Sequence, residues 1–389
     1  MQFETFAVRA GHKPDPATGA NVPPIYTAST YILSEVGKNQ QYGYSRSGNP
    51  TRDRLEECIS TLEGTKYGLA FSSGMAAISA ITSLLKKDEN ILLCNEVYGG
   101  TYKLFKTLLP RYGISTIDVD ATRPKEIAES ITGASRMIWL ETPTNPLMTV
   151  LDITAIAKIS RAHGLILVVD NTLASPYLQR PVASGADIVV EGTKYLAGHG
   201  DIIGGALATS DEALYRHLKF VQNKAGAVPS PFYCYLTLRG SRTLHLRMER
   251  HSQNATEIAE MLERDSRVNE VNYPFLSTFA YSSTARSQMR LGGGNLSFRI
   301  NGGFENARRF IKSLKLFELG VSLGSVSSLV SHPASMTHRS LPGDEKTKLK
   351  ITDDLIRMSV GIENIGDLTE DIRGALDAAF EIDVAVPQQ

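Results

Sequence analysis

The sequence predicts an α/β protein whose main sheet is parallel and wrapped by helices. Three short apolar runs, at residues 137–140, 165–169 and 188–190, are separated by helix-like stretches. Such alternation is typical of parallel sheets. Residues 152–164 lie between the first two runs, carry apolar side chains at helical spacing and end at Gly164, a residue type common at helix C-termini. This part of the chain is therefore expected to form a strand–helix–strand unit.

The segments on either side of this unit differ from it in pattern. The first ~60 residues are rich in Pro, Gly, Ser, Thr and Tyr and show no sustained period, so we expect an extended arm there. A long amphipathic helix is expected over residues 241–263, followed by shorter mixed elements. We therefore predict an arm over residues 1–50, a large domain over 51–245 and a smaller C-terminal α+β domain over 246–389.

The composition of the chain indicates which kinds of binding partner are to be expected. The 389 residues carry 41 basic and 41 acidic side chains, so charge favours neither nucleic acid nor a membrane surface. The sequence shows no apolar run of the ~18 residues that a membrane span needs and no basic-then-apolar leader pattern, and we expect a cytoplasmic protein. Cys58, Cys94 and Cys234 are widely spaced, and His332 and His338 lack a third ligand at metal spacing, so neither a disulfide framework nor a metal site is expected.

Polar residues follow each of the three apolar runs. Glu141 begins the first polar segment, Asp170 the second, and Lys194 closes the third. In open α/β sheets ligands bind beyond the carboxyl ends of the strands, so a lysine and an aspartate are expected in one crevice. Taken singly, such a lysine is usually a solvated surface residue and such an aspartate a helix cap. Their joint placement favours a site.

A second candidate binding element is the segment at residues 71–75, Phe-Ser-Ser-Gly-Met. It joins a short apolar strand to a helical stretch. Small residues at a helix N-terminus expose backbone N–H groups that favour a phosphate. A plain helix cap remains the alternative, and no dinucleotide fingerprint or P-loop motif accompanies the segment.

Seven motifs occur in an order that is specific to one group of enzymes. They are YSRSGNPTR from Tyr44, SGM from Ser73, VYGG from Val97, ETPTNP from Glu141, DNT from Asp170, TKYLAGH from Thr193 and SHPASMTH from Ser331. With them the chain closely resembles, over nearly its whole length, the Cys/Met-metabolism (trans-sulfuration) family of fold-type I pyridoxal-phosphate (PLP) enzymes. That family includes cystathionine γ-lyase, cystathionine γ-synthase and methionine γ-lyase. The resemblance implies an aminotransferase-like fold in which the large domain binds PLP.

The resemblance also implies roles around the cofactor. Lys194 would carry PLP as a Schiff base and later move protons, and Asp170 would hold the ring nitrogen; both roles agree with the positions of these residues after apolar strands. Tyr98 would stack on the ring and act as an acid or base. The phosphate would be held by residues at two helix starts, namely the backbone amides of Gly74 and Met75 and the hydroxyl of Thr193.

Further implied roles concern the substrate and a second subunit. Tyr44 and Arg46 would reach the phosphate from a neighbouring subunit, with Tyr44 also near the substrate, so a homodimer or homotetramer is implied. Arg357 would bind the substrate α-carboxylate, Asn145 would lie near the ring hydroxyl, and Ser322 would orient the lysine. Without the resemblance, residues 44–52 are typical of a solvated turn, and an arginine such as Arg357 is more often a surface or ion-pair residue.

The implied reaction is γ-elimination on cystathionine or a related sulfur amino acid, giving 2-oxobutanoate, ammonia and a thiol. The alternative is γ-replacement on O-acetyl- or O-succinylhomoserine, which shares the removal of protons at Cα and Cβ. A protein that binds the cofactor without turnover is a third possibility. The residues at position 100, Gly100, and at positions 221–231 are similar to those of cystathionine γ-lyases and γ-synthases. Those at positions 199 and 321, His199 and Val321, are similar to those of methionine γ-lyases and homoserine-ester sulfhydrylases.

One position departs from the family pattern. Glu191 stands where a phosphate-binding serine is usual, and the segment after Asp187 is one residue short. A carboxylate aimed at a phosphate would be repelled. Either Glu191 faces elsewhere and Thr193 carries the contact, or the cofactor is held more loosely; we expect the first.

Overall fold

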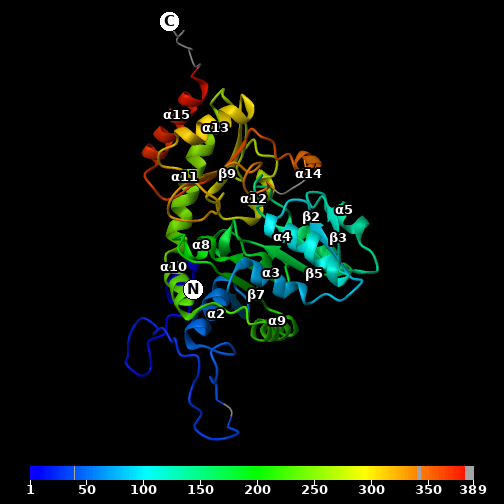
Figure 1. Ribbon diagram of the computed structural model, residues 1–389, viewed down its shortest axis with the longest axis vertical. Helices are drawn as coiled ribbons and strands as arrows, with labels where there is room; N and C mark the ends of the chain where they lie inside the picture. Colours follow the sequence, from blue (N-terminus) through cyan, green and yellow to red (C-terminus); the bar gives the residue numbers. More distant parts are fainter. Residues whose placement is uncertain (39, 340–342, 382–389) are drawn as a thin grey trace.

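The computed structural model describes residues 1–38, 40–339 and 343–381. In this part of the chain two sheets are surrounded by helices (Figure 1). The helices are α1 Phe3–Arg9, α2 Pro50–Glu63, α3 Gly74–Thr82, α4 Gly99–Lys103, α5 Pro124–Ser130, α6 Ile153–Ala162, α7 Ser175–Leu178, α8 Thr193–Ala197, α9 Glu212–Ala225, α10 Pro231–Ser241, α11 Leu244–Glu263, α12 Ser282–Gln288, α13 Gly303–Ser313, α14 Gly343–Lys348 and α15 Ile365–Phe380. The first two lie in or next to the N-terminal arm.

The larger sheet has seven strands among the described residues, in the spatial order β1-β7-β6-β5-β4-β2-β3. The strands are β1 Tyr67–Phe71, β2 Asn90–Cys94, β3 Ser115–Val119, β4 Ser135–Glu141, β5 Ile166–Asp170, β6 Ile188–Gly192 and β7 Gly205–Thr209. Neighbouring strands from β3 to β6 pair in parallel, and only β7 runs antiparallel to its neighbours β1 and β6. The expected parallel sheet is confirmed, and the three apolar runs are β4, β5 and β6.

Helices cover both faces of this sheet because the strands carry apolar side chains on both faces. Ala70 and Ala206 face α2 and belong to one hydrophobic cluster, whereas Leu69 and Leu207 face α3 and belong to another. The helix expected over residues 152–164 is α6, which begins at an Asp152 cap that accepts a hydrogen bond from the Ala155 N–H. Both faces of the parallel strands are therefore buried, as continuous apolar strands require.

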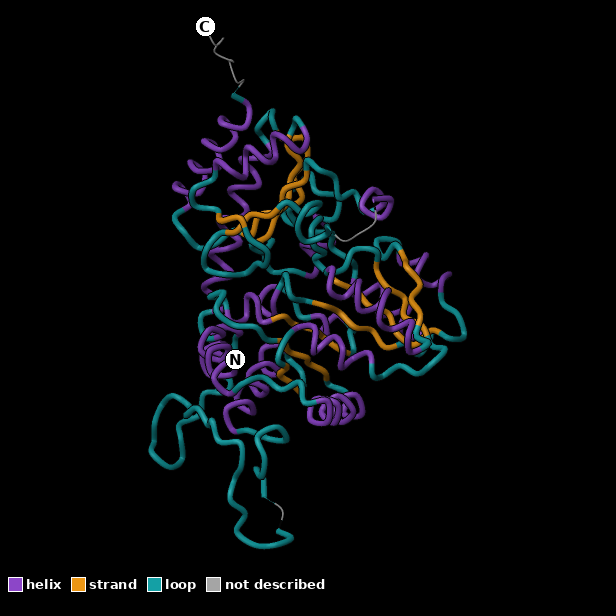
Figure 2. The backbone as a smooth tube through the Cα atoms, viewed as in Figure 1, coloured by secondary structure: helices purple, strands orange, loops and turns teal. Residues whose placement is uncertain are grey.

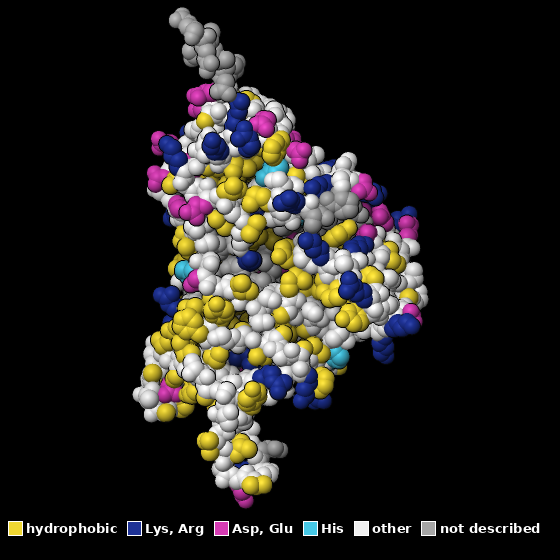
Figure 3. Space-filling view, viewed as in Figure 1, with side chains coloured by type: hydrophobic (Ala, Val, Ile, Leu, Met, Phe, Trp, Pro, Cys, Tyr) yellow, Lys and Arg dark blue, Asp and Glu magenta, His cyan; other side chains and the backbone are white. Residues whose placement is uncertain are grey.

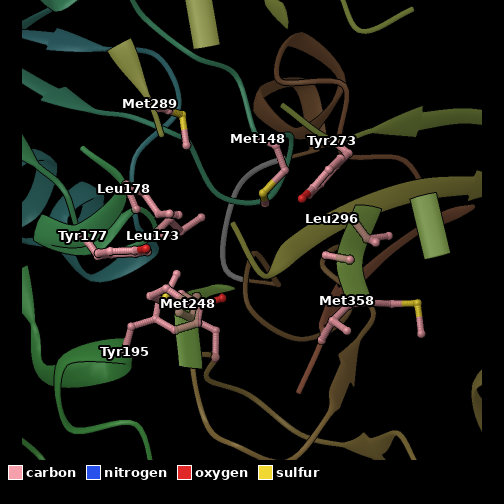
Figure 4. Close-up of a cluster of buried hydrophobic side chains, with 14 of the residues drawn as sticks. Met148, Leu173, Tyr177, Leu178, Tyr195, Met248, Tyr273, Met289, Leu296 and Met358 are labelled. Atoms are coloured by element: carbon pink, nitrogen blue, oxygen red, sulfur yellow. The ribbon is translucent and has the colours of Figure 1, made fainter. Parts of the chain in front are cut away.

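The second sheet contains, in the described chain, the strands β8 Val268–Asn272, β9 Asn295–Ile300, β10 Glu318–Leu319, β11 Leu329–Ser331 and β12 Leu355–Ser359. Their spatial order is β10-β11-β12-β9-β8. Figure 2 shows this sheet above the larger one, with α11, α13 and α15 beside it. Side chains from both parts of the chain form one buried cluster, which includes Met148 and Tyr195 as well as Tyr273 and Leu296 (Figure 4). The residue bounds of the two domains stay a prediction.

The N-terminal arm contains one element that the sequence did not indicate. Helix α1 buries Phe3 and Ala7. The ring of Phe3 meets the ring of Tyr177 edge-on at 5.1 Å. Seven residues are too short for helical periodicity to stand out, so packing, and not pattern, reveals this helix. No helix in the described ranges is both long enough and apolar enough to cross a membrane.

Candidate active site

The carboxyl ends of β4, β5 and β6 meet at one edge of the larger sheet. Glu141 at the end of β4 is in register with Asp170 at the end of β5, and β5 runs parallel to β6. Helix α8 follows β6 directly and begins with Thr193 and Lys194. The prediction that these strand ends bring a lysine and an aspartate together at one edge of the sheet is therefore confirmed.

Lys194 lies beside Ser322, which is located between β10 and β11 of the second sheet. Its Nζ donates a hydrogen bond to Ser322 Oγ at 2.7 Å. Ser322 adopts φ +102°, a backbone conformation that residues other than glycine rarely take and that is concentrated at functional sites. Partial burial lowers the pKa of Lys194, and the nearby Arg357 cation lowers it further. A larger fraction of this amine is therefore neutral and able to accept a proton.

Asp170 is a buried carboxylate with a relative exposure of 6%. Its Oδ1 accepts hydrogen bonds from the Thr172 N–H at 3.1 Å and the Thr172 hydroxyl at 2.6 Å. Burial raises the pKa of Asp170, and within the described residues it forms no ion pair. A protonated ring nitrogen would supply the missing cation and favour the ionised carboxylate, so Asp170 fits the predicted cofactor.

Whereas Asp170 is a buried anion, Arg357 on β12 is a buried cation. Its relative exposure is 1%, its Nη2 donates to the Ser322 carbonyl at 2.5 Å and its Nη1 donates to Asn145 Oδ1 at 3.3 Å. No carboxylate of the described chain pairs with it, and its Nε has no partner there. Burial lowers the pKa of Arg357 to about 10, which leaves it charged at neutral pH. Such a guanidinium suits an incoming carboxylate.

Tyr98 directly precedes α4 and has a relative exposure of 49%. Its backbone N–H donates to Glu141 Oε2 at 2.6 Å. A Cβ added to Gly100 would lie 2.5 Å from the Tyr98 ring and 2.7 Å from Met75 Sδ. The ring therefore occupies its place only because residue 100 lacks a side chain, and a cysteine there would force the ring to shift.

The predicted phosphate-binding residues also converge. Ser73 caps α3, and its hydroxyl accepts a hydrogen bond from the Ala76 N–H. A Cβ on Gly204 would lie 2.8 Å from Thr193, and a Cβ on Gly205 would lie 2.4 Å from the Ser73 carbonyl oxygen. Because these glycines let the backbones approach, the N-terminus of α3, which contains Gly74 and Met75, lies next to the Thr193 hydroxyl. The arrangement fits an anion.

Glu191 faces away from this anion cradle. Its Oε1 accepts a hydrogen bond from Asn171 Nδ2 at 2.8 Å, and its carboxyl lies against that of Glu63 on α2. Both side chains are buried. The expectation that Glu191 turns elsewhere is confirmed, and the role of Thr193 in place of the usual serine stays a prediction.

The buried Glu63–Glu191 pair should make stability depend on pH. Burial raises the pKa of Glu63 from 4.5 to about 7, and burial and then the Glu63 charge raise that of Glu191. Because these carboxyls keep their protons in the folded state, stability is full below about pH 4.5 and falls as pH rises through 7. Wild type should lose free energy of unfolding between pH 5 and pH 8, and Glu63→Gln should make this loss about 3 kcal/mol smaller, as measured by denaturant unfolding. An unchanged pH slope would contradict the prediction.

The arm residues Tyr44 and Arg46 are not brought to Lys194 within one chain. Arg46 Nη1 donates to the Asn223 carbonyl at 2.9 Å, and its guanidinium lies 5.6 Å from the centre of the Tyr44 ring. Tyr44 itself is exposed. Their contact with the phosphate of a neighbouring subunit stays a prediction.

Two carboxyls near the site were not assigned a role by the sequence. Glu141 belongs to a recognised motif, and Glu96 follows β2. Both have oxygens that accept hydrogen bonds from a neighbouring loop. An acidic residue at or just beyond the end of an apolar strand was the available signal, but its partners depend on loop geometry.

Comparisons with known proteins agree with this geometry. The family model described as "Cys/Met metabolism PLP-dependent enzyme" matches residues 4–377. A cystathionine γ-lyase of Dictyostelium discoideum is 45% identical over 375 residues, which cover 96% of this chain and 97% of that one. A cystathionine β-lyase of Coxiella burnetii is 45% identical over 377 residues, with coverage of 96% and 97%. The crystal structure of a cystathionine γ-synthase from Xanthomonas oryzae pv. oryzae with cystathionine superposes with a TM-score of 0.95 at 39% identity, covering 97% of this chain and 98% of that one.

Proposed function

Because the chain belongs to the Cys/Met metabolism family of PLP-dependent enzymes, we propose that it breaks the Cγ–S bond of cystathionine or a related sulfur amino acid. The products are 2-oxobutanoate, ammonia and a thiol. One observation carries the proposal: Ser322 accepts hydrogen bonds from both Lys194 and Arg357. A carboxylate bound by Arg357 therefore places the α-carbon of an amino acid beside the Lys194 amine.

The cofactor would be held by residues from three parts of the crevice. Lys194 would bind its aldehyde and Asp170 its ring nitrogen, while the phosphate would lie between the N-terminus of α3 and Thr193. Tyr98 would lie against the ring, and Asn145 near the ring hydroxyl. When bound, PLP stabilises the negative charge that develops at the substrate α-carbon and its neighbour.

The residues of the chain would then move protons around the fixed substrate. Arg357 holds the α-carboxylate by a charge-assisted hydrogen bond. The Lys194 amine, whose pKa is lowered, accepts the proton from Cα and takes part in proton removal at Cβ. The half-exposed Tyr98 hydroxyl protonates the departing thiolate. Water and reprotonation complete the release of ketoacid and ammonia.

γ-Replacement on an acylated homoserine is the second candidate, because a γ-synthase shares this fold over nearly its full length. One panel separates the alternatives. The purified holoenzyme is given cystathionine, methionine, homocysteine, or O-acetyl- or O-succinylhomoserine with cysteine. Mainly 2-oxobutanoate from the sulfur amino acids supports γ-elimination, a new thioether supports replacement, and pyruvate from cystathionine indicates β-elimination. No product from any mixture would contradict the enzyme assignment of this site.

We further propose that a second copy of the chain completes the site, in a homodimer or homotetramer. The arm projects from the rest of the chain and exposes hydrophobic side chains (Figure 3). Ile32 has a relative exposure of 89%, and Val36 is fully exposed. Exposed apolar side chains clustered in this way favour a protein interface. Docking of the arm on a partner would carry Tyr44 and Arg46 toward the partner's phosphate.

Val321 should influence which substrate is preferred. It precedes Ser322 and has a relative exposure of 63%, and its apolar side chain offers no charge to the distal amino group of cystathionine. Val321→Glu should therefore raise kcat/KM for cystathionine relative to methionine by about fivefold, the effect of one exposed ion pair. Measuring both substrates with both proteins checks this ratio, and the matched control is Val321→Gln. A ratio that stays constant, or wild-type efficiency on cystathionine equal to or above that on methionine or homocysteine, argues against this role.

A further inference from the structure

The segments that follow β2 and β4 are joined by hydrogen bonds that two carboxyl groups accept. The loop after β2 contains Glu96 and Tyr98, and Glu141 is the last residue of β4, directly before the loop that contains Thr144 and Thr149. Glu141 Oε2 accepts a hydrogen bond from the Tyr98 backbone N–H at 2.6 Å. In the opposite direction, Glu96 accepts hydrogen bonds from the hydroxyls of Thr144 at 2.5 Å and Thr149 at 3.3 Å. Each loop therefore holds the other through a carboxyl group.

Burial disfavours the charged form of both carboxyl groups. Glu141 is buried and Glu96 is half-buried, and neither forms an ion pair within the described ranges. Burial raises the pKa of both, and the neighbouring Asp170 charge raises that of Glu141 further. Burying an acid in this way disfavours folding. Hydrogen bonds to specific loop atoms are the compensation that the structure supplies.

The same two loops carry the side chains expected around the cofactor ring. Tyr98 follows Glu96 by two residues, and Asn145 follows Thr144 and accepts a hydrogen bond from Arg357. The Thr142 N–H donates to the Asp170 carbonyl at 3.2 Å, which fixes the start of the second loop to β5. Movement of either loop would therefore move the ring stacker relative to Asn145 and Asp170.

We propose that Glu141 and Glu96 form a reciprocal carboxyl lock whose task is to position Tyr98 and Asn145 against the cofactor ring. These are positioning residues, since they act through the residues they hold. The inference rests on the proposed placement of the cofactor. It adds that the affinity and asymmetric environment of the ring depend on two acids that do not touch it.

The test uses the full chain stripped of cofactor and titrated with PLP. Dissociation constants and the visible circular dichroism of the bound cofactor are measured for wild type, Glu141→Ala and Glu141→Gln. Losing the hydrogen bond to a carboxyl should weaken binding about tenfold in Glu141→Ala and reduce the dichroism. Glu141→Gln keeps an oxygen for the Tyr98 N–H and should restore most of both signals.

Glu63→Gln is the matched control, because Glu63 is as buried as Glu141 but its carboxyl oxygens form no hydrogen bond with either loop. It should bind PLP like wild type. Equal weakening in Glu63→Gln and Glu141→Ala would overturn the lock, as would wild-type affinity and dichroism in Glu141→Ala. If Glu141→Ala does not fold, Thr149→Val replaces it, since it removes only a hydroxyl that contacts Glu96. About threefold weaker binding supports the lock, and unchanged binding overturns it.

The outcomes also separate this inference from the proposed function. If wild type fails to bind PLP, or binds it equally after Lys194→Ala without losing visible absorbance, the cofactor site itself is misplaced. If wild type and Lys194→Ala differ as expected but the Glu141 variants match wild type, only the lock is wrong.

Discussion

Replacing Lys194 by alanine is expected to remove the visible absorbance of the lysine-bound cofactor and to lower kcat/KM by at least about a thousandfold. The variant lacks both the amine that binds the aldehyde and the base beside the α-carbon. Its fold should persist, because α8 is held by other contacts, such as the hydrogen bond from Arg247 Nη1 to the Tyr195 carbonyl at 2.6 Å. Absorbance spectra and the substrate panel provide the two measurements.

Ser322→Ala is the control for this prediction. It removes the hydrogen bond to Lys194 Nζ but keeps the amine, so absorbance should remain and turnover should fall much less. Retention of both the absorbance and the activity in Lys194→Ala would show that another residue carries the cofactor.

Replacing Arg357 by alanine is expected to lower kcat/KM by about a hundredfold or more, while cofactor absorbance stays close to that of wild type. The guanidinium is buried without a carboxylate partner in the described chain, so the substrate carboxylate is the anion that would pair with it. Losing one member of a buried charged pair costs about 2–5 kcal/mol. Much of the loss should appear in KM, because ground-state binding is affected.

Arg357→Lys keeps the charge but loses the planar fork, and should recover only part of the affinity. Thermal unfolding of both variants separates binding from stability. A normal KM for the amino acid in Arg357→Ala would place the carboxylate elsewhere in the crevice.

The sequence predicted the parallel strands well because their evidence is local. Runs such as residues 165–169 are apolar throughout, as strands buried on both faces must be. Lys194 and Asp170 could be found for the same reason, since each follows such a run and parallel strands end at one edge. Side chains two positions apart in a strand point to the same face of the sheet. Glu191 therefore points to the same face as Val189, against α2.

Features that depend on distant contacts were harder to predict. The buried position of Arg357 involves contacts with Ser322 and Asn145, which are distant from it in the chain, and a lone arginine in the sequence is more typical of the surface. The exchange of carboxyls between the loops of Glu96 and Glu141 depends on hydrogen bonds across 43 to 53 positions of the chain. Helix α1 was missed because its stability comes from packing against Tyr177, and its pattern is too short to stand out.

The claim at the centre of this account is that the strand-end crevice binds PLP through Lys194. The most direct test reduces the holoenzyme with borohydride, which fixes the cofactor to the amine that carries it, and then maps the label by peptide mass spectrometry. One labelled peptide is expected, with the added mass on Lys194. Labelling at another lysine, or no label on a protein that retains activity, would contradict it.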